Sequence, residues 1–553
     1  MSNALERLCR AAGIAAEYHD IWGNLHRAPD ATCRELLFAM GIDSGDPERS
    51  LRELEDRPWR RAAPPVAVFR VDERPYRLTL HFPETALHAT QKWELALEDG
   101  TVHSGTFVPR DLEHRGERPI ESARHVEAVF AWHDALPTGY HRFTLASDGA
   151  ASTTTSYIVA PQRCHLPAAL DAGEKVWGVT AQLYGVRSTR NWGIGDFTDL
   201  RTLAAQWVRR GAGFIGVNPL HALFPHNPAH ISPYSPSSRL FVNVLYIDVE
   251  ALDDLRESSD VSAEINAPEF RARVAAARDA DLVDYGAVAA LKLPALERLY
   301  AHFRQHHLAK ESVRGRAFRS FQQRRGTELR LHALFEALQA HLHKDDPGIW
   351  GWPVWPQAYR DPRSAAVSAF EREHIERVEF YEYLQWQADE QLARAAARAE
   401  DLDAGIGLYV DLSISIDRSG AEAWAHQEHY ALGVSVGAPP DEINRQGQNW
   451  GLPPLLPDRL REAAYAPYIA TLRANMRHAG ALRIDHVMGL ARLFWIPDGR
   501  DGSAGAYVHY PFDDLLGIVA LESQRNRCMV IGEDLGTVPD EVRAGLSRTG
   551  VLS

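Results

Sequence analysis

The sequence predicts an α/β protein whose catalytic part is of the (β/α)8-barrel type. Five short apolar segments carry a polar side chain at or near their carboxyl ends, as barrel strands do where they deliver catalytic groups. These segments are residues 176–183, 214–220, 408–412, 481–486 and 528–534. Between the first two, Leu200, Leu203, Ala204, Trp207 and Val208 fall on one stripe of a predicted helix. That arrangement is a βαβ unit, which supports a parallel sheet.

Two smaller regions precede the predicted barrel. Residues 1–60 form a charged segment in which Leu5, Leu8 and Ala12 have helical spacing, so we expect helices there. Residues 61–163 alternate apolar and polar side chains, as at 77–82 and 141–145, which predicts a β-sandwich accessory domain. Residues 161–167 have the composition of a linker, and we place the start of the catalytic domain, residues 164–553, within it.

The catalytic domain has a long insertion. The second apolar segment ends at residue 220 and the third begins at residue 408, a separation too long for a plain loop. Residues 287–293 and 327–335 have helical character. We therefore expect a largely helical subdomain at about 250–400, above the site, in which Trp350, Trp352 and Trp355 mainly serve packing.

Two carboxylates, Asp485 and Glu533, stand at the ends of the fourth and fifth segments. Side chains alternate along a strand, so Arg483 shares a face with Asp485 and its cation favours the ionised carboxylate. Carboxylates from neighbouring strands are the layout of a retaining glycosidase or transglycosidase, with one nucleophile and one acid/base. The competing interpretation is strand-end caps with a structural ion pair.

Longer motifs resemble those of amylomaltases, the 4-α-glucanotransferases of glycoside hydrolase family 77. The similarity runs from about residue 176 to the last residue, and residues 136–141 resemble the β-domain of the longer bacterial members. The most specific motif is the stretch Ser435-Val-Gly-Ala-Pro-Pro-Asp-Glu-Ile-Asn-Arg-Gln-Gly-Gln-Asn-Trp-Gly-Leu-Pro-Pro454. The other matching motifs are 232–236, 350–356, 383–386, 483–486 and 531–539.

This resemblance implies roles for individual residues. Asp485 would be the nucleophile and Glu533 the general acid/base. The stretch 435–454 would be a loop that covers the acceptor subsites, where Gln448 and Trp450 hold an incoming glucan and exclude water. The remaining expected glucan contacts are Tyr234, which stacks on the sugar beside the scissile bond, and the subsite residues Asp411, Arg483 and His486.

One family feature is missing from the printed sequence. A (β/α)8 barrel has eight strands, whereas five are found here, and family members carry a third essential Asp in a downstream His-Asp pair. The His-Asp pairs in this chain, His19-Asp20 and His133-Asp134, lie in the N-terminal regions. We therefore expect a partial barrel, which is either an inactive fragment or part of a longer active enzyme.

Three functions follow from these observations. The first is a 4-α-glucanotransferase, which moves segments of α-1,4-glucan to a new 4-hydroxyl by retaining double displacement. The second is an α-amylase-like hydrolase, in which water replaces the acceptor. The third is a catalytically incomplete protein that at most binds α-glucan.

Composition is compatible with the α-1,4-glucan partner that the resemblance implies. With 60 basic and 74 acidic residues the net charge is −14, which argues against nucleic acid, whereas a neutral sugar polymer requires no complementary charge. The sequence has no phosphate-binding glycine-rich loop, so we expect no cofactor. The four cysteines form no CxxC pair, and His426 with His429 fits a solvated helix face, so we expect no metal. Charges near the N-terminus and the lack of a membrane-length apolar stretch predict a cytoplasmic protein without a membrane partner.

Overall fold

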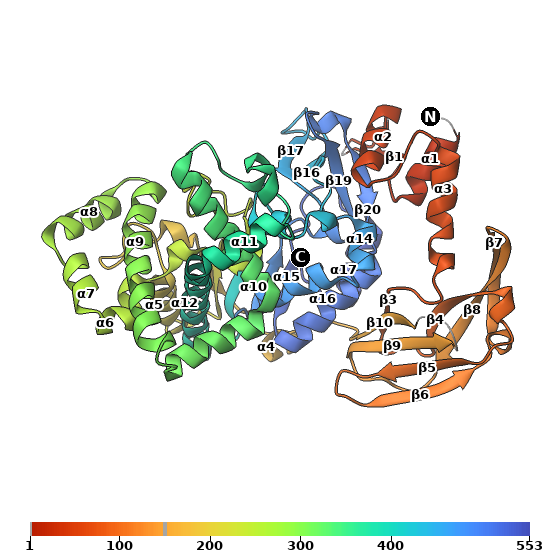
Figure 1. The fold of residues 1–553 in the computed structure, drawn as a ribbon, viewed down its shortest axis with the longest axis horizontal. Helices are drawn as coiled ribbons and strands as arrows, with labels where there is room; N and C mark the ends of the chain where they lie inside the picture. Colours follow the sequence, from red (N-terminus) through yellow and green to blue (C-terminus); the bar gives the residue numbers. More distant parts are fainter. Residues whose placement is uncertain (1–2, 21, 148–151) are drawn as a thin grey trace. The chain divides into compact units, whose positions relative to one another are not determined.

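The computed structural model describes residues 3–20, 22–147 and 152–553, which divide into two units (Figure 1). The first unit comprises Met1–His165, Glu428–Leu472 and His486–Ser553. The second comprises Leu166–Gln427 and Arg473–Asp485. The chain therefore passes from the second unit to the first twice, between Gln427 and Glu428 and between Asp485 and His486.

The N-terminal segment contains the predicted helices and one hairpin that the helical pattern did not predict. The helices are α1 (Asn3–Ala11), α2 (Asp30–Ala39) and α3 (Pro47–Asp56), and the strands are β1 (Glu17–His19) and β2 (Leu25–Arg27). Asp20 Oδ1 accepts the backbone N–H groups of Trp22 at 2.9 Å and Asn24 at 2.8 Å. Such aspartate-to-backbone bonds close a turn, which explains the hairpin between α1 and α2.

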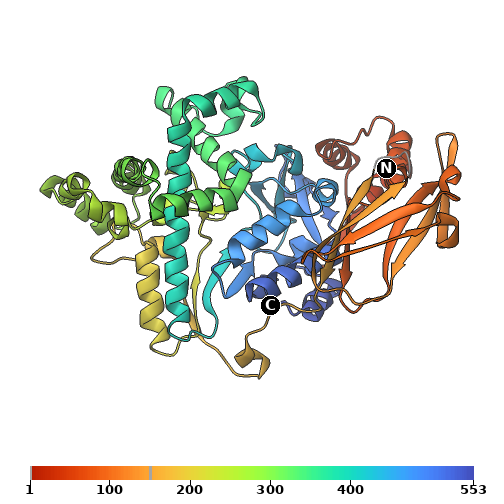
Figure 2. The same ribbon diagram turned by 60° about the horizontal axis from the view of Figure 1, so that its bottom comes forward.

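The accessory region forms a β-sandwich whose two layers are visible in Figure 2. One sheet has the order β3-β10-β9-β5-β6 and the other the order β4-β8-β7. The strands are β3 (Val66–Arg70), β4 (Tyr76–Pro83), β5 (Gln91–Ala96), β6 (Val102–Phe107), β7 (Glu113–Ile120), β8 (Ala123–Trp132), β9 (Gly139–Ser147) and β10 (Thr153–Ala160). The predicted alternation is confirmed in β4, where Tyr76, Leu78, Leu80 and Phe82 all point into the core between the sheets.

The sandwich packs against a helix far along the chain. Helix α16 (Phe512–Asn526) contacts β3 and β10. Tyr140 Oη donates to Glu522 Oε1 at 2.6 Å, and the backbone N–H of His165 donates to Ser523 Oγ at 2.8 Å. The segment 161–167, expected to be a linker, is therefore anchored to α16 in the first unit.

The second unit contains four parallel strands of the predicted barrel. They are β11 (Gly178–Ala181), β12 (Phe214–Val217), β15 (Gly407–Leu412) and β18 (Ala481–Ile484), paired in that order. Helix α5 (Phe197–Val208) follows β11, and its N-terminus is closed by a reciprocal capping box between Asp196 and Asp199. Asp411 and Arg483 stand opposite each other in the register of β15 and β18.

The predicted helical insertion is also in the second unit. Its helices are α6 (Asp253–Glu257), α7 (Ser259–Ile265), α8 (Pro268–Asp279), α9 (Tyr285–Phe303), α10 (Val313–Asp345), α11 (Ala365–Glu373) and α12 (Ile375–Glu400). The long helices α10 and α12 lie side by side, and α12 also packs on α5 (Figures 1 and 2). A short antiparallel pair, β13 (His221–Ala222) and β14 (Ser238–Val242), precedes the insertion.

The remainder of the first unit contains an antiparallel sheet of order β17-β16-β19-β20. Its strands are β16 (Val434–Ala438), β17 (Gln448–Leu452), β19 (Arg492–Pro497) and β20 (Ala506–His509). The fifth predicted barrel strand is β21 (Met529–Gly532), followed by α17 (Asp540–Thr549), and Ile531 of β21 forms a parallel bridge with Leu552. Across the described residues, no helix is both long and apolar enough to cross a membrane.

Candidate active site

Four of the predicted site residues form one connected group in the second unit. Arg483 Nη1 donates to Asp411 Oδ1 at 2.7 Å, and Arg483 Nη2 lies 2.9 Å from Asp485 Oδ1. Tyr234, from the loop between β13 and β14, donates its hydroxyl to Asp411 Oδ2 at 2.6 Å. The predicted proximity of Arg483 and Asp485 on one strand face is confirmed.

The charges of this group are set by its ion pairs. Burial alone would lower the pKa of Arg483, but its bonds to Asp411 and Asp485 outweigh burial and raise that pKa above its ordinary value. Burial, together with the bond to Asp411, raises the pKa of the Tyr234 phenol. At neutral pH Arg483 is therefore a fixed cation beside Asp485, and Tyr234 is a protonated donor.

Two side chains of this group are partly exposed to solvent. The Asp485 side chain is 23% exposed, and Tyr234 is 40% exposed. The Asp485 backbone N–H donates to Leu412 O at 3.0 Å, so the strand pairing continues one residue beyond β18. The carboxylate is thus held by the sheet while its oxygens remain accessible.

The first unit holds a second group around Glu533. The backbone N–H of His486 donates to Glu533 Oε2 at 3.0 Å, and that of Leu535 donates to Glu533 Oε1 at 2.8 Å. His486 has a φ of 50°, in the left-handed region that non-glycine residues seldom adopt. Strained backbone of this kind is concentrated at functional sites, and here it points the His486 N–H at the carboxylate.

The half-buried His486 ring packs against the tryptophan of the long motif. Burial lowers the pKa of His486 to about 4, although the nearby Glu533 opposes the shift, so the ring is neutral near pH 7. The Trp450 ring meets it edge to face, with centroids 5.3 Å apart. Trp450 Nε1 in turn donates to Gln448 Oε1 at 3.3 Å. Gln448, Trp450, His486 and Glu533 therefore form one contiguous group.

The expectation that residues 435–454 form a loop needs correction. Strands β16 and β17 pair as an antiparallel hairpin, which we call the signature hairpin (residues 434–452). A register shift between Val436 and Gly437 lets the strands follow a curved path. Only residues 439–447 connect the two strands as a loop. Gln448 and Trp450 therefore stand on β17, a strand supported by a four-stranded sheet.

Sequence reasoning missed the residues that hold the Tyr234 loop. Asp417 Oδ2 accepts the Ser235 hydroxyl at 3.0 Å and lies 3.2 Å from His230 Nε2. The bond to Asp417 raises the pKa of His230. The sequence offered one indication of this role, since Asp417 lies only five residues after the third apolar segment. Its partners could not be predicted, because they lie almost two hundred positions earlier in the chain.

The tryptophans of the insertion behave mainly as packing residues, as expected. Trp355 is fully buried and donates through Nε1 to Gln339 Oε1 at 3.0 Å. Trp352 Nε1 donates to the Arg418 carbonyl at 2.8 Å. Trp350 differs, because it is 38% exposed and stands beside His230 of the Tyr234 loop.

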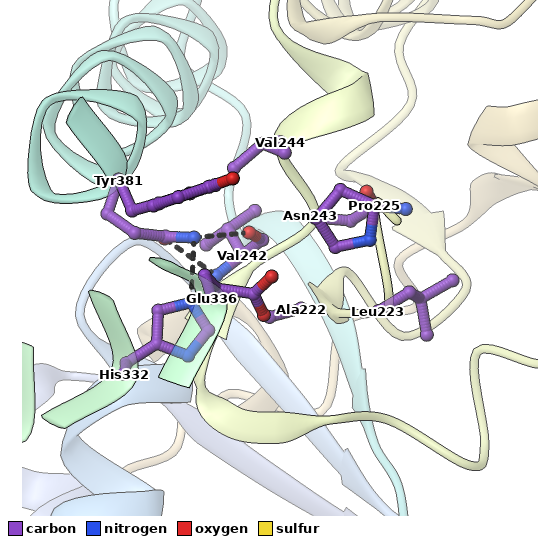
Figure 3. A pocket seen from close by; sticks show the side chains of 10 residues that line it. Ala222, Leu223, Pro225, Val242, Asn243, Val244, His332, Glu336 and Tyr381 are labelled. Atoms are coloured by element: carbon purple, nitrogen blue, oxygen red, sulfur yellow. Dashed lines mark hydrogen bonds between the residues drawn. The ribbon is translucent and has the colours of Figure 1, made fainter. Parts of the chain in front are cut away.

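A small buried cavity of about 10 Å³ lies next to the base of the Tyr234 loop (Figure 3). The Glu336 carboxyl group, from α10, points into the middle of the lining residues. Within the described residues, Asn243 Nδ2 and His332 Nδ1 are buried without a hydrogen-bond partner. Burial raises the pKa of Glu336 to about 8, so this carboxyl group is mostly protonated at neutral pH. The volume suits one water molecule rather than a sugar.

Among the described residues, two groups of side chains have metal-ligand spacing. One is His426 with Glu428 and His429, and the other is Asp254 with Glu257 and His307, where Arg314 pairs with the carboxylates. Ligand atoms of Asp254, Glu257 and His307 lie within 4.8 Å of one another. Arg314 donates to both carboxylate oxygens of Asp254, at 2.8 and 2.6 Å, and Tyr383 donates to the same residue. This is an ion-pair network in the insertion. His426, of the histidine pair in the sequence, lies 2.8 Å from Glu328 Oε2.

Comparisons with known proteins agree on one family. A family model described as 4-alpha-glucanotransferase matches residues 181–553, and a model of the MalQ N-terminal beta sandwich domain matches residues 62–161. A 4-alpha-glucanotransferase of Haemophilus influenzae is 41% identical in an alignment that covers 100% of this chain and 75% of that protein. One of Mycobacterium bovis is 39% identical with the same coverage. The crystal structure of amylomaltase from Corynebacterium glutamicum matches at 32% identity with a TM-score of 0.85, covering 100% of this chain and 74% of that one.

Proposed function

The chain belongs to the 4-alpha-glucanotransferases of glycoside hydrolase family 77, and on this premise we propose that Asp485 and Glu533 carry out its transfer reaction. In the first half, the Asp485 carboxylate attacks the anomeric carbon of an α-1,4-glucan. Glu533 gives its proton to the glycosidic oxygen, the carbon–oxygen bond breaks, and the reducing-end part leaves with a new 4-hydroxyl. The product is a glucan covalently attached to Asp485.

The second half uses the same two groups in reverse. Glu533, now a carboxylate, removes the proton from the 4-hydroxyl of an incoming glucan. That oxygen attacks the anomeric carbon and releases Asp485 as a carboxylate, while Glu533 regains its proton. Two inversions at one carbon retain the α-configuration. The substrate class is therefore α-1,4-glucan as both donor and acceptor.

One observation carries this assignment. Asp485 and His486 share a peptide bond, and the N–H of that bond is donated to Glu533 Oε2 at 3.0 Å. A single peptide unit thus connects the proposed nucleophile to the proposed acid/base. Arg483 supplies the fixed cation that favours ionised Asp485. We expect the two carboxyl groups to lie about 5–5.5 Å apart in a ligand-bound crystal structure, the separation of retaining enzymes.

We assign the residues around Asp485 and Glu533 to substrate binding and not to bond breaking. We propose that Tyr234, Asp411 and Arg483 contact the glucosyl unit that becomes attached to Asp485. His486 would line the same subsite as a neutral ring. Gln448 and Trp450 would contact the acceptor glucan, because an aromatic face suits the apolar face of a pyranose and its presence excludes water.

A pair of conservative substitutions tests the two roles. Asp485→Asn should lower transfer from maltotriose by about 10³-fold or more, because no other nucleophile is provided. Glu533→Gln should lower transfer from maltotriose by a similar factor. This variant should still release fluoride from α-maltosyl fluoride in the first half of the reaction, because fluoride leaves without needing a proton. The matched control is Asp534→Asn, since the Asp534 carboxylate beside Glu533 pairs with Arg543.

The outcomes separate the competing functions. Transfer that survives either substitution within about tenfold would show that the roles are wrongly assigned. Wild-type enzyme given maltotriose should release glucose and also form longer maltodextrins. Reducing ends without longer products would indicate the α-amylase-like hydrolase, and binding of maltodextrin without turnover would indicate the non-catalytic glucan-binding protein.

A further inference from the structure

The N-terminal segment extends the sheet that carries the signature hairpin. Ala15 N–H donates to Tyr507 O, and His509 N–H donates to Gly13 O, both at 2.8 Å. Ile14 thereby forms an antiparallel bridge with Val508 on β20, the edge strand of the sheet. Ile14 and Val508 are both buried. The N-terminal segment thus covers a sheet edge that would otherwise be open.

Two further contacts fasten the same segment to the sheet. The buried Tyr18 ring packs edge to face on Phe494 and Tyr507, with centroids 5.5 Å from each. Phe494 stands on β19 directly opposite Gly437 of the signature hairpin. From α2, the buried Thr32 hydroxyl donates to the Ala504 carbonyl at 2.8 Å. Aromatic packing and a buried hydrogen bond make this a specific attachment.

The turn that Thr32 holds is in direct contact with the signature hairpin. A Cβ placed on Gly502 would lie 2.7 Å from Gly447 Cα and 2.8 Å from Gln448 N, so only glycine allows the two backbones to approach this closely. Asn449 Nδ2 also donates to the Arg500 carbonyl at 3.3 Å. Gln448 and Asn449 begin β17, the strand that carries Trp450.

We propose that Gly13, Ile14, Ala15, Tyr18 and Thr32 of the N-terminal segment act as positioning residues for the acceptor side of the active site. They hold β20 and the 500–505 turn, which in turn hold the start of β17 and hence Gln448 and Trp450. This inference rests on the proposed contact of Gln448 and Trp450 with the acceptor glucan. The segment therefore controls how often an acceptor sugar, rather than water, takes the glucan from Asp485.

Two substitutions loosen this support from different sides. Thr32→Val keeps the side-chain shape and removes the bond to Ala504, and Gly502→Ala inserts a methyl group between the turn and β17. The matched controls are Arg49→Ala, whose ion pair with Glu53 lies within α3, and Gly433→Ala, where a Cβ meets nothing within 4 Å. Each enzyme is assayed for the acceptor KM with maltose, for the ratio of hydrolysis to transfer, and for fluoride release from α-maltosyl fluoride.

We expect both test variants to raise the acceptor KM and the hydrolysis-to-transfer ratio about three- to tenfold, with fluoride release unchanged within about twofold. The controls should match wild type. Equal losses in all three measurements, or a lower melting temperature with an unchanged ratio, would overturn the proposal and leave the segment a purely stabilising role. Trp450→Ala tests the premise that the signature hairpin contacts the acceptor glucan. If Trp450→Ala raises the hydrolysis-to-transfer ratio and Thr32→Val does not, only the inference about the N-terminal segment fails. If neither substitution raises the ratio, the proposed acceptor role of the hairpin fails as well.

Discussion

Arg483 shows what single-residue reasoning could and could not predict. Strand parity placed Arg483 beside Asp485, because two residues on one strand face depend on local geometry alone. The second partner, Asp411, could not be predicted with the same reasoning, since it requires knowing which strands are neighbours and in what register. The bond between Asp417 and Ser235 is of the same kind and went unpredicted. Local patterns thus found the chemical groups, and long-range pairing supplied their supports.

Glu336 gives a pH-dependent prediction at the residue scale. Its pKa is raised from 4.5 to about 8 by burial, so the folded protein keeps a proton that the unfolded chain loses. The contribution of Glu336 to the free energy of unfolding is fully present below pH 4.5 and decreases as the pH rises towards 8. Glu336→Gln should therefore raise the free energy of unfolding at pH 8 by about 2–4 kcal/mol and change it little at pH 4.5.

Urea unfolding at the two pH values measures this difference. Asp345→Asn, which changes an exposed carboxylate at the end of the same helix, is the control and should show no such pH dependence. An equal effect of Glu336→Gln at both pH values would mean that the substitution acts through packing instead of ionisation.

At the scale of elements, the barrel strands were predictable and the signature hairpin was not. The five apolar segments match β11, β12, β15, β18 and β21, although β15 begins one residue before its predicted segment, because a buried parallel strand has a continuous apolar sequence. The stretch 435–454 is rich in Pro, Gly and polar residues, which resembles a loop. Its strands are stabilised by neighbours such as Phe494 and by the approach of Gly447 to Gly502, neither of which is visible in a local pattern.

Trp450 is the residue of the signature hairpin with the clearest expected effect. Trp450→Ala should raise the ratio of hydrolysis to transfer about tenfold, because removing the ring admits water where we propose that the acceptor glucan binds. Product analysis from maltotriose, comparing glucose with longer maltodextrins, gives the ratio. Trp177→Ala, which truncates a half-exposed tryptophan on the second unit, is the control. A ratio equal to that of wild type would contradict the role of Trp450.

At the scale of the whole molecule, the order of regions along the chain differs from the grouping in space. We propose the regions 1–60, 61–163 and 164–553 as domains, with the helical insertion at about 250–400. The first unit nevertheless collects the N-terminal segment, the sandwich and two stretches of the catalytic region. The reason is contacts such as Tyr140 with Glu522, between residues almost four hundred positions apart, which no local periodicity reveals.

The anchored segment 161–167 leads to a prediction about proteolysis. Cys164 N–H donates to Thr549 O, and His165 N–H donates to the buried Ser523 hydroxyl, both at 2.8 Å. Ser523→Ala leaves a partly buried N–H without its acceptor, at a cost of about 1–3 kcal/mol at most. Cleavage near residue 163 by trypsin should therefore become several-fold faster, seen as a fragment of residues 1–163 on a denaturing gel. Ser503→Ala, in a surface turn, should cleave like wild type, and equal rates for both variants would contradict the anchoring.

The left-handed backbone at His486 has a consequence for how the chain can change in length. One extra residue after Asp485 would move the next N–H by about 3.8 Å, out of hydrogen-bond reach of Glu533. The N–H of Val487 also donates to the Glu533 carbonyl. Two consecutive residues, His486 and Val487, therefore both fix the position of the chain relative to Glu533. Insertions that surface loops tolerate would here separate Asp485, the proposed nucleophile, from Glu533, the proposed acid/base. The stretch from Asp485 to Val487 therefore acts as a spacer of fixed length, and gene variants with an insertion or deletion there should lose transfer even when they fold.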